Sequence, residues 1–372
     1  MEIERPELST LPAEIRAYIE ALEAELEQLR AGESRGKSSV SPLEADEPPT
    51  TINIVTISAK GTAKRTPRHL YQRQRRGGMG VFDLEMPEEE APAFLVAADE
   101  SESLLLISNF ARVFLLPLRE LPESLVRSKG IFLLEHLPFD RGEKLLLALP
   151  HQRSGYLAVV TRSGQVRRLH HTAVREGMAP GTLLYTVTEL GLPAAACWTP
   201  GDADLFIATR QGRAIRFAER EVPAKSGLGI RLGEGEAIAA VTAVRPESGV
   251  FLLGADGRGT IRLMSGFSAN KAPGAGGKSA ISAEEVVGAV TVGERDDIFI
   301  ISRLGKLIRF RADEVPPKEG VVQGVHCMAL RADECAAVTT SERVRDNKET
   351  PATWAERGTQ EAEVSTKDLD GD

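Results

Sequence analysis

The sequence predicts an all-β protein built from six repeated hairpins. Six segments share one pattern: four mostly apolar residues, a small residue, two variable residues and then glycine, replaced once by alanine. The anchor positions are Gly61, Ala111, Gly164, Gly212, Gly257 and Gly305, at intervals of 50, 53, 48, 45 and 48 residues. Two short apolar runs around a tight turn are typical of a β-hairpin. Six hairpins with a period near fifty indicate a radial, six-bladed arrangement over residues 51–341.

A basic, glycine-rich segment follows the first hairpin. Seven Lys or Arg residues and no acidic residue lie between Lys60 and Arg76, and three glycines follow at Gly77, Gly78 and Gly80. Glycine lets backbone N–H groups approach an anion closely, and paired arginines supply the charge that a phosphate requires. We expect Arg75 and Arg76 to be exposed. The segment is a candidate phosphate-contacting loop.

Basic residues also recur just beyond the hairpin turns. Four residues after the anchor stand Arg65, Leu115, Arg168, Arg216 and Arg309, with Arg262 one place later in the fifth repeat and Lys64 beside Arg65. Because side chains alternate along a strand, a repeated position in a repeated blade faces the same way each time. The pattern predicts an arc of positive charge around the rim, interrupted at Leu115. The alternative is that exposed strands simply favour arginine.

These motifs resemble one known family. The stretch Thr56–Arg65, followed by Tyr71–Val81, resembles the first blade of the C-terminal domain of DNA gyrase A, and Gln74 to Gly80 match the box motif of that family. The resemblance covers roughly residues 51 to 341. It implies a six-bladed β-pinwheel in which the box joins the first and last blades. Gln74, Arg75, Arg76, Gly77, Gly78 and Gly80 occupy the matching positions, whereas Met79 stands where a basic residue is common.

The resemblance implies binding and wrapping of double-stranded DNA. We expect a stand-alone relative that binds and bends duplex DNA without sequence preference, as an accessory to gyrase-like control of DNA topology. Its partners would be DNA and possible gyrase or topoisomerase subunits, in the cytoplasm at the nucleoid. The alternative function is a β-propeller scaffold for protein partners that has lost DNA wrapping. Weak salt dependence of binding would favour the scaffold.

Net charge is unevenly distributed along the chain. The whole chain carries −8, but residues 1–51 carry 12 acidic against 5 basic residues, and residues 342–372 carry 9 against 5. The repeat region is therefore at +3. Such a weak excess means that DNA binding must depend on local clustering of cations.

The two ends of the chain differ from the repeats. Residues 1–32 contain Ile15, Ile19, Leu22, Leu26 and Leu29 in a 4-3-4-3 spacing, which predicts a short amphipathic helix. This helix could form a homodimer, pack on a topoisomerase partner or fold back on its own domain. Residues 33–50 are predicted to be a flexible linker. Residues 342–372 are predicted to be an acidic disordered tail, which either competes with DNA or only solvates the domain.

Other classes of chemistry are disfavoured. Cys197, Cys327 and Cys335 show no metal-ligand spacing, and no catalytic constellation stands out, so we expect no metal, no cofactor and no strand cleavage by this chain alone. The segment Ala272–Ser279 fits a loose phosphate-binding loop, but it lies between predicted hairpins rather than between a strand and a helix, which disfavours ATP. No apolar run is long enough to cross a membrane.

Overall fold

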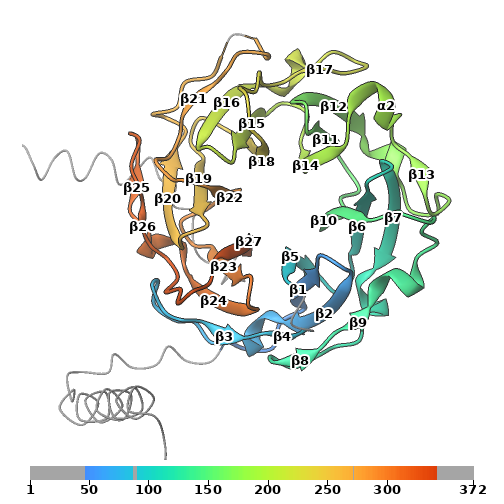
Figure 1. Cartoon of the computed structure of the whole chain (residues 1–372), viewed down its shortest axis with the longest axis vertical. Coiled ribbons are helices and arrows are strands. Elements are labelled where there is room, and N and C mark those ends of the chain that lie inside the picture. The colour runs from blue at the N-terminus through green and yellow to red at the C-terminus, as the bar shows by residue number, and fades with distance from the viewer. Residues whose placement is uncertain (1–46, 87–89, 271, 342–372) are drawn as a thin grey trace, which may run out of the picture. The chain divides into compact units, whose positions relative to one another are not determined.

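Six β-sheets arranged as a ring make up the part of the chain that the computed structural model describes, residues 47–86, 90–270 and 272–341 (Figure 1). The predicted all-β, six-bladed fold is confirmed. The predicted helix at 1–32, most of the linker at 33–50 and the tail at 342–372 lie outside the described residues.

Each blade takes its three inner strands from one repeat and its outer strand from a different part of the chain (Figure 1). From the inside outward, blade 1 contains β5 (Pro92–Asp99), β1 (Ile52–Ser58), β2 (Thr62–Pro67) and β9 (Ile131–Phe132). Blade 2 contains β10 (Leu145–Pro150), β6 (Ser103–Ser108), β7 (Arg112–Pro117) and β13 (Thr182–Leu183). Blade 3 contains β14 (Pro193–Thr199), β11 (Tyr156–Thr161), β12 (Gln165–His170) and β17 (Gly227–Leu228).

The remaining blades follow the same order. Blade 4 contains β18 (Ile238–Val244), β15 (Asp204–Thr209), β16 (Arg213–Ala218) and β21 (Lys278–Ser279). Blade 5 contains β22 (Val286–Val292), β19 (Gly249–Gly254), β20 (Arg258–Leu263) and β25 (Pro317–Lys318), and β26 (Val325–His326) also pairs with β20. Blade 6 contains β27 (Cys335–Ser341), β23 (Asp297–Ser302), β24 (Lys306–Arg311) and β3 (Val81–Phe82). A separate parallel pair joins β4 (Leu84–Glu85) to β8 (Ser128–Lys129).

Short helical turns connect these strands. Most follow the second strand of a hairpin: η2 (Arg68–Leu70), η3 (Leu118–Glu120), η5 (His171–Val174), η6 (Glu219–Glu221) and η7 (Ala312–Glu314). The others are η4 (Leu133–His136) and α2 (Val187–Leu190).

The hydrophobic core is divided among the six seams between neighbouring blades. Each seam holds one cluster of buried side chains, for example Val55 and Ile57 of blade 1 against Leu104 and Leu106 of blade 2. Ile54, on the other face of the same strand, belongs to the cluster shared by blades 6 and 1. A strand packed on both faces needs apolar residues at consecutive positions. This is why the repeats read as unbroken apolar runs.

The repeat anchors are the tight-turn residues of the hairpins. All five anchor glycines have positive φ, between 77° and 102°, and Ala111 adopts the same left-handed region at φ 55°. Glycine reaches this region without the Cβ clash that other residues meet. The spacing of the anchors therefore reports the spacing of the blades.

Candidate nucleic-acid interface

The box segment closes the ring. It leaves blade 1 after η2 and crosses to blade 6, where β3 pairs with β24 through Val81–Leu307 and Phe82–Lys306. On the way, the N–H of Gln74 donates to the carbonyl of Arg309 at 2.8 Å, and the N–H of Gly77 donates to the carbonyl of Cys327 at 2.8 Å. The box thus supplies the outer strand of the last blade from the first repeat.

The box glycines permit close backbone approach. Gly80 has φ 71°, and a Cβ added there would lie 2.7 Å from the carbonyl oxygen of Leu307. A Cβ on Gly78 would lie 2.6 Å from Oε1 of Gln74. That same Oε1 accepts a hydrogen bond from the N–H of Gly80 at 3.2 Å. The glutamine and the glycines therefore fix the shape of the loop against blade 6.

The two box arginines have different environments. Arg75 is exposed, as expected. Arg76 is half-buried, so the expectation that it would be exposed is wrong. Its backbone N–H donates to the Glu314 carboxylate at 2.9 Å, its Nε to the Glu314 carbonyl at 2.7 Å and its Nη1 to the His326 carbonyl at 3.2 Å. Arg76 fastens the box, which leaves Arg75 as the box arginine presented to solvent.

A buried acid anchors the continuation of the box into blade 1. Asp83 follows β3, and its carboxylate forms an ion pair with Lys64 at 2.8 Å, both side chains being fully buried. It also accepts hydrogen bonds from the Tyr71 hydroxyl at 2.6 Å and the Thr56 hydroxyl at 2.7 Å. Lys64 donates further to the carbonyl of Leu125 at 3.0 Å. This cluster fastens the segment from the box to β4, called the strap below, to blade 1.

Sequence reasoning missed Asp83. The available signal was that Asp83 is the first acidic residue after the long basic segment that begins at Lys60. Burial lowers the pKa of Lys64, and the Asp83 carboxylate opposes that shift. Burial and the same carboxylate raise the pKa of Tyr71 well above its ordinary value.

The predicted exposed arc of basic residues is not present. Five of its six members are buried, with exposed fractions of 2% for Lys64, 8% for Arg65, 5% for Arg216, 5% for Arg262 and 2% for Arg309. Arg168 is half-buried. Four of the arginines do share one position and one face of their strands, but that face points into a seam rather than outward. They are Arg65, Arg168, Arg216 and Arg309.

Arg309 shows what these side chains do. Its guanidinium forms an ion pair with the buried Asp297 at 2.5 Å and donates to the carbonyls of Arg68 and Tyr71, each at 3.0 Å. The carboxylate belongs to blade 6 and the two carbonyls to the turn that follows the blade 1 hairpin. Arg309 therefore bridges two neighbouring blades and donates to backbone carbonyls of the next turn, one of which, that of Arg68, also accepts the N–H of Tyr71 at 3.1 Å.

Arg216 repeats this arrangement in the seam between blades 4 and 5. It pairs with Asp204 of its own blade at 2.7 Å and donates to the carbonyls of Met264 and Phe267, at 2.8 and 3.1 Å, in the turn of blade 5. Both carbonyls stand at the same distance from their anchor glycine as those that Arg309 contacts. The repeated position is thus a structural bridge between blades.

Two further arginines form variants of the bridge. Arg65 donates to the side chain of Asn53 at 3.3 Å and to the carbonyl of Leu121, in the turn of blade 2, at 3.0 Å. Arg168 pairs with the buried carboxylate of Glu219 of blade 4 at 3.2 Å. Each again links its own blade to the turn that follows the hairpin of the next blade.

Arg262 does not belong to the series. Because it stands one place later, it lies on the opposite face of its strand, and Ile261 occupies the face that the bridging arginines use. Its guanidinium lies 5.6 Å from the ring centre of Phe267, where the ammonium of Lys278 also lies, at 4.4 Å. It therefore lies in the seam between blades 4 and 5.

Four exposed cations stand at hairpin tips. Lys60, Arg162, Arg210 and Arg303 stand one or two places before their anchors in blades 1, 3, 4 and 6, and all four are exposed. Sequence reasoning missed this set, although its position relative to the anchors was readable. Gly77 of the box bonds to Cys327, whose own N–H donates at 2.9 Å to the carbonyl of Gly257 at the fifth hairpin tip. The box and the tips thus lie at the same end of the blades.

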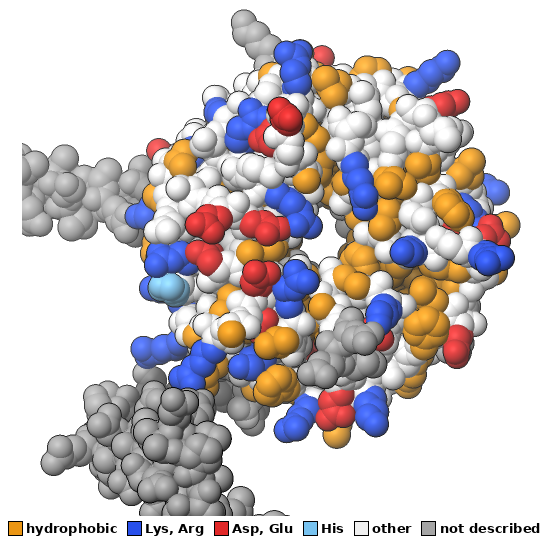
Figure 2. All heavy atoms as spheres, in the orientation of Figure 1, with side chains coloured by type: hydrophobic (Ala, Val, Ile, Leu, Met, Phe, Trp, Pro, Cys, Tyr) orange, Lys and Arg blue, Asp and Glu red, His pale blue; other side chains and the backbone are white. Residues whose placement is uncertain are grey.

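The face shown in Figure 2 carries mixed charge. Lys and Arg side chains are dispersed among acidic and apolar ones, and hydrophobic side chains gather on the side formed by β7 and β9. In the part of the chain that the structure describes, every helix is too short or too polar to span a membrane. Among those same residues, no cluster of His, Cys, Asp or Glu could hold a metal ion.

A ring of six blades, closed by an outer strand from the first repeat, defines a β-propeller of the pinwheel type. In sequence and in fold, the chain resembles the C-terminal domain of DNA gyrase A. A family model described as the DNA gyrase C-terminal domain, β-propeller, matches residues 53–91, 102–150, 203–245 and 296–334.

Two curated relatives illustrate the extent of the similarity. The DNA gyrase A protein of Pseudomonas aeruginosa is 28% identical over 86% of this chain and 40% of its own length. That of Escherichia coli is 26% identical over 76% of this chain and 33% of its own length. The chain therefore spans at most two-fifths of these two relatives.

Solved structures agree on the fold. The structure of a DNA gyrase A C-terminal domain matches 78% of this chain and 99% of its own, with a TM-score of 0.66 and 21% identity. The C-terminal domain of DNA topoisomerase IV matches 80% of this chain and 95% of its own, with a TM-score of 0.54 and 19% identity.

Proposed function

We propose that this protein binds and bends double-stranded DNA as an accessory to the control of DNA topology. The observation that carries the proposal is the box, which closes the ring on blade 6 and presents Arg75 to solvent. The similarity to the gyrase A C-terminal domain supports it. In this proposal the chain acts beside a gyrase or topoisomerase core at the nucleoid and cleaves no strand itself.

The proposed DNA contacts are Arg75 and the exposed tip cations. A repeated set of cations along an arc can bend DNA through phosphate contacts, without reading bases. The other box residues, Gln74, Arg76, Gly77, Gly78 and Gly80, then act by holding the loop in place. Lys64, Arg65, Arg216, Arg262 and Arg309 are buried, so we do not propose them as phosphate contacts. Half-buried Arg168 is paired with the fully buried carboxylate of Glu219, so it is not proposed either. The tip cations Arg210 and Arg303 also face carboxylates, of Glu285 and Glu334, but those pairs are exposed, and exposed ion pairs are weak.

The test is ligation of nicked circular plasmid with increasing amounts of protein, followed by gel analysis of the linking number. We expect a shift that grows with protein and is strongly reduced in Arg75→Ala. The matched control is Arg220→Ala, because the Arg220 side chain is 79% exposed in the turn of blade 4 and has only a long contact with its neighbour Glu221. An equal loss in both variants would show that total charge, and not the box, determines wrapping.

A second candidate function is a scaffold for protein partners. The burial of the predicted basic arc favours it, since fewer cations face solvent than the sequence suggested. DNA affinity that falls steeply with salt supports DNA binding, because displaced counterions drive that association. Absence of DNA binding at low salt would leave the scaffold as the better account.

A further inference from the structure

In four blades, a backbone segment runs along the outer edge of the hairpin. We call it the outer segment of a blade: the residues between the turn of the next repeat and the outer strand which that repeat supplies. In three blades the N–H thirteen residues after an anchor donates to the carbonyl of the bridging position, four residues after the neighbouring anchor. These bonds run from Ser124 to Arg65 at 2.8 Å, from Asn270 to Arg216 at 2.6 Å and from Gln74 to Arg309 at 2.8 Å. In blade 5, β25 pairs with β20 at the same position, Ile261.

Blade 2 lacks this contact. Its outer segment is residues 175–181, between η5 and β13, and none of these residues donates its N–H to the carbonyl of Leu115. Val113, two places earlier on β7, accepts the N–H of Gly181 at 2.9 Å. Because backbone groups alternate in direction along a strand, the Leu115 carbonyl also lies on the outer edge. The edge of blade 2 is therefore open at Leu115.

The outer segment of blade 2 is short and bends away from β7. From the donor position to the outer strand the chain takes seven or eight residues in blades 1, 4, 5 and 6, but only five in blade 2. Two turns take up part of this length, closed by N–H donation from Met178 to Arg175 and from Thr182 to Ala179, each at 3.2 Å. At the donor position, Gly177 has φ 77°, and a Cβ added there would meet nothing within 4 Å.

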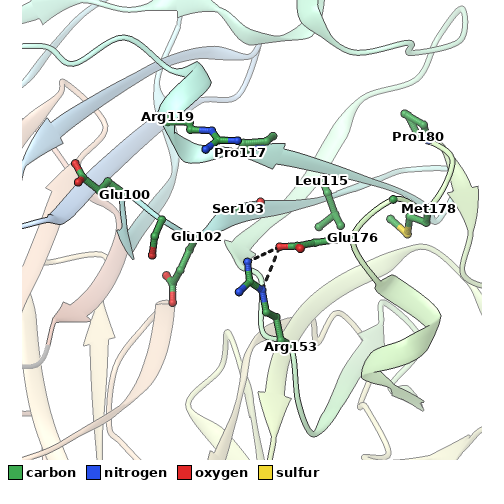
Figure 3. Close-up of a pocket in the computed structure, with 12 residues that line it drawn as sticks. Glu100, Glu102, Ser103, Leu115, Pro117, Arg119, Arg153, Glu176, Met178 and Pro180 are labelled. Carbon is green, nitrogen blue, oxygen red and sulfur yellow. Dashed lines mark hydrogen bonds and ion pairs between the residues drawn. The ribbon is translucent and has the colours of Figure 1, made fainter.

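A cavity of about 380 Å³ lies between β7 and this segment (Figure 3). Leu115 and Pro117 line it from β7, and Gly177, Met178 and Pro180 line it from the outer segment. Blade 3, whose outer segment is shorter still, also lacks the edge bond, but the cavity lies beside blade 2. The lining includes three carboxylates and two guanidinium groups, so it offers no net positive charge to a DNA phosphate.

We propose that this cavity receives an extended segment of a partner protein, which adds a short strand to β7. The repeats define the kind of occupant, because polypeptide backbone fills the equivalent place in four other blades. The added strand would run parallel to β7, as the outer segments of blades 1 and 5 run parallel to their hairpin strands. The proposal does not depend on DNA binding.

The chemistry of the site describes the partner segment. One of its N–H groups would donate to the Leu115 carbonyl, and an apolar side chain would pack on Leu115 and Met178. In strand addition, main-chain hydrogen bonds supply affinity and side-chain pockets supply specificity. Nearby apolar surface favours a protein, since Leu183 on the outer strand of the same blade is 56% exposed. Residues 342–372 of this chain match the apolar walls less well, because they carry 9 acidic and 5 basic residues.

The test uses the full chain labelled with carbon-13-methyl methionine. Met178 lines the cavity, and Met178→Leu identifies its methyl signal. The probe is the acetylated and amidated peptide of residues 122–126, which contains the donor Ser124 of blade 1. The matched control carries N-methylserine, which removes that donor and keeps the side chain. We expect a saturable shift of the Met178 signal, at a dissociation constant on the order of millimolar, and an unchanged signal from Met79 in the box.

The control peptide and two variants locate the binding. The N-methylated peptide should bind about tenfold more weakly, because the Leu115 carbonyl then stays without a donor. Leu115→Asp should also weaken binding about tenfold, because it places a charge on an apolar wall. Leu183→Asp is the matched control, since Leu183 is exposed and does not line the cavity. Should Leu115→Asp fail to fold, the N-methylated peptide still decides.

Four results would overturn the proposal. Two come from the peptides: no Met178 shift at saturating concentration, or an equal shift with the N-methylated control. The other two are a Met178 shift on deletion of residues 342–372 and a shift on concentrating the protein alone. In those cases the chain's own end or a second copy, and not a partner, would occupy the cavity. DNA bending is tested separately by Arg75→Ala, so either proposal can fail without the other.

Discussion

Two sets of basic side chains have opposite environments that the sequence does not separate. Arginines in the middle of the second strand are buried bridges between blades, and cations at the hairpin tips are exposed. A buried guanidinium is tolerated because carboxylates and carbonyls satisfy its donors. Removing one therefore affects stability, whereas removing a tip cation affects only what the surface binds.

Arg309→Leu is expected to lower the free energy of unfolding by about 3 kcal/mol or more, because it leaves the buried Asp297 with fewer partners and removes a donor from the carbonyls of Arg68 and Tyr71. Chemical denaturation measures the loss. Arg220→Ala, at an exposed turn position, should change stability by less than about 0.5 kcal/mol. Equal, small effects in both variants would contradict the bridging role of Arg309.

Thiol burial predicts loss of stability at alkaline pH. Burial raises the pKa of the Cys327 thiol from its ordinary value of 9.0 to about 12, and those of Cys197 and Cys335 shift in the same direction. Above pH 9 the unfolded chain releases these protons while the folded chain keeps them, so stability falls as pH rises. Each thiol contributes about 1.4 kcal/mol per pH unit in this range.

Urea unfolding between pH 8 and 10 checks this contribution. Cys327→Ala should make the free energy of unfolding fall less steeply with pH, because the contribution of one of the three buried thiols is lost. Met328→Leu, at the adjacent buried position, should keep the full slope. A slope that Cys327→Ala leaves unchanged would refute the assignment.

The strap from the box to β4 is the element on which ring closure depends. It contacts blade 6 through β3, blade 1 through Asp83, and, through Gly77, the Cys327 segment that is bonded to the tip of the blade 5 hairpin. Two-residue strands have little intrinsic stability. Close backbone contact and the buried Lys64–Asp83 ion pair must therefore hold β3 in place.

Gly80→Ala is expected to disturb this closure. A Cβ there combines a left-handed φ with a 2.7 Å approach to the Leu307 carbonyl. Gly142→Ala is the matched control, because Gly142 has φ 82° and nothing within 4 Å of an added Cβ. The control should cost about 1 kcal/mol from backbone strain, and Gly80→Ala a further 1–3 kcal/mol from overpacking. Equal midpoints in urea would show that the contact at Gly80 relaxes freely.

Hairpins, anchors and blade number were predictable from the sequence because each depends on local residue order. Apolar runs and turn glycines such as Gly164 encode them directly. The direction of the bridging arginines was not predictable. Alternation along a β-strand shows which side chains share a face, but it does not show whether that face meets solvent or another blade. Arg216 faces inward because blade 5 lies against that side. Asp83 was missed for a related reason, as its partners come from three separate segments.

At the scale of the whole molecule, six sheets are held as one ring by seam clusters, bridging arginines and a single strap. Five seams join repeats that are consecutive in the chain, whereas the seam between blades 6 and 1 joins its two ends. The strap is therefore where the proposed DNA wrapping would be coupled to the stability of the ring. DNA bent around the ring would load this junction.

Asp83→Asn tests that coupling. The change leaves the buried ammonium of Lys64 without its carboxylate, and breaking one partner of a buried pair costs about 3–5 kcal/mol. We expect a lower melting temperature and, at a temperature where the variant is folded, a reduced linking-number shift with nearly normal DNA affinity. Affinity is retained because Asp83 is fully buried and the tip cations are unchanged. A folded Asp83→Asn protein that shifts linking number normally would show that the inner anchor of the strap is dispensable, and that Arg75 and the tips suffice to bend DNA.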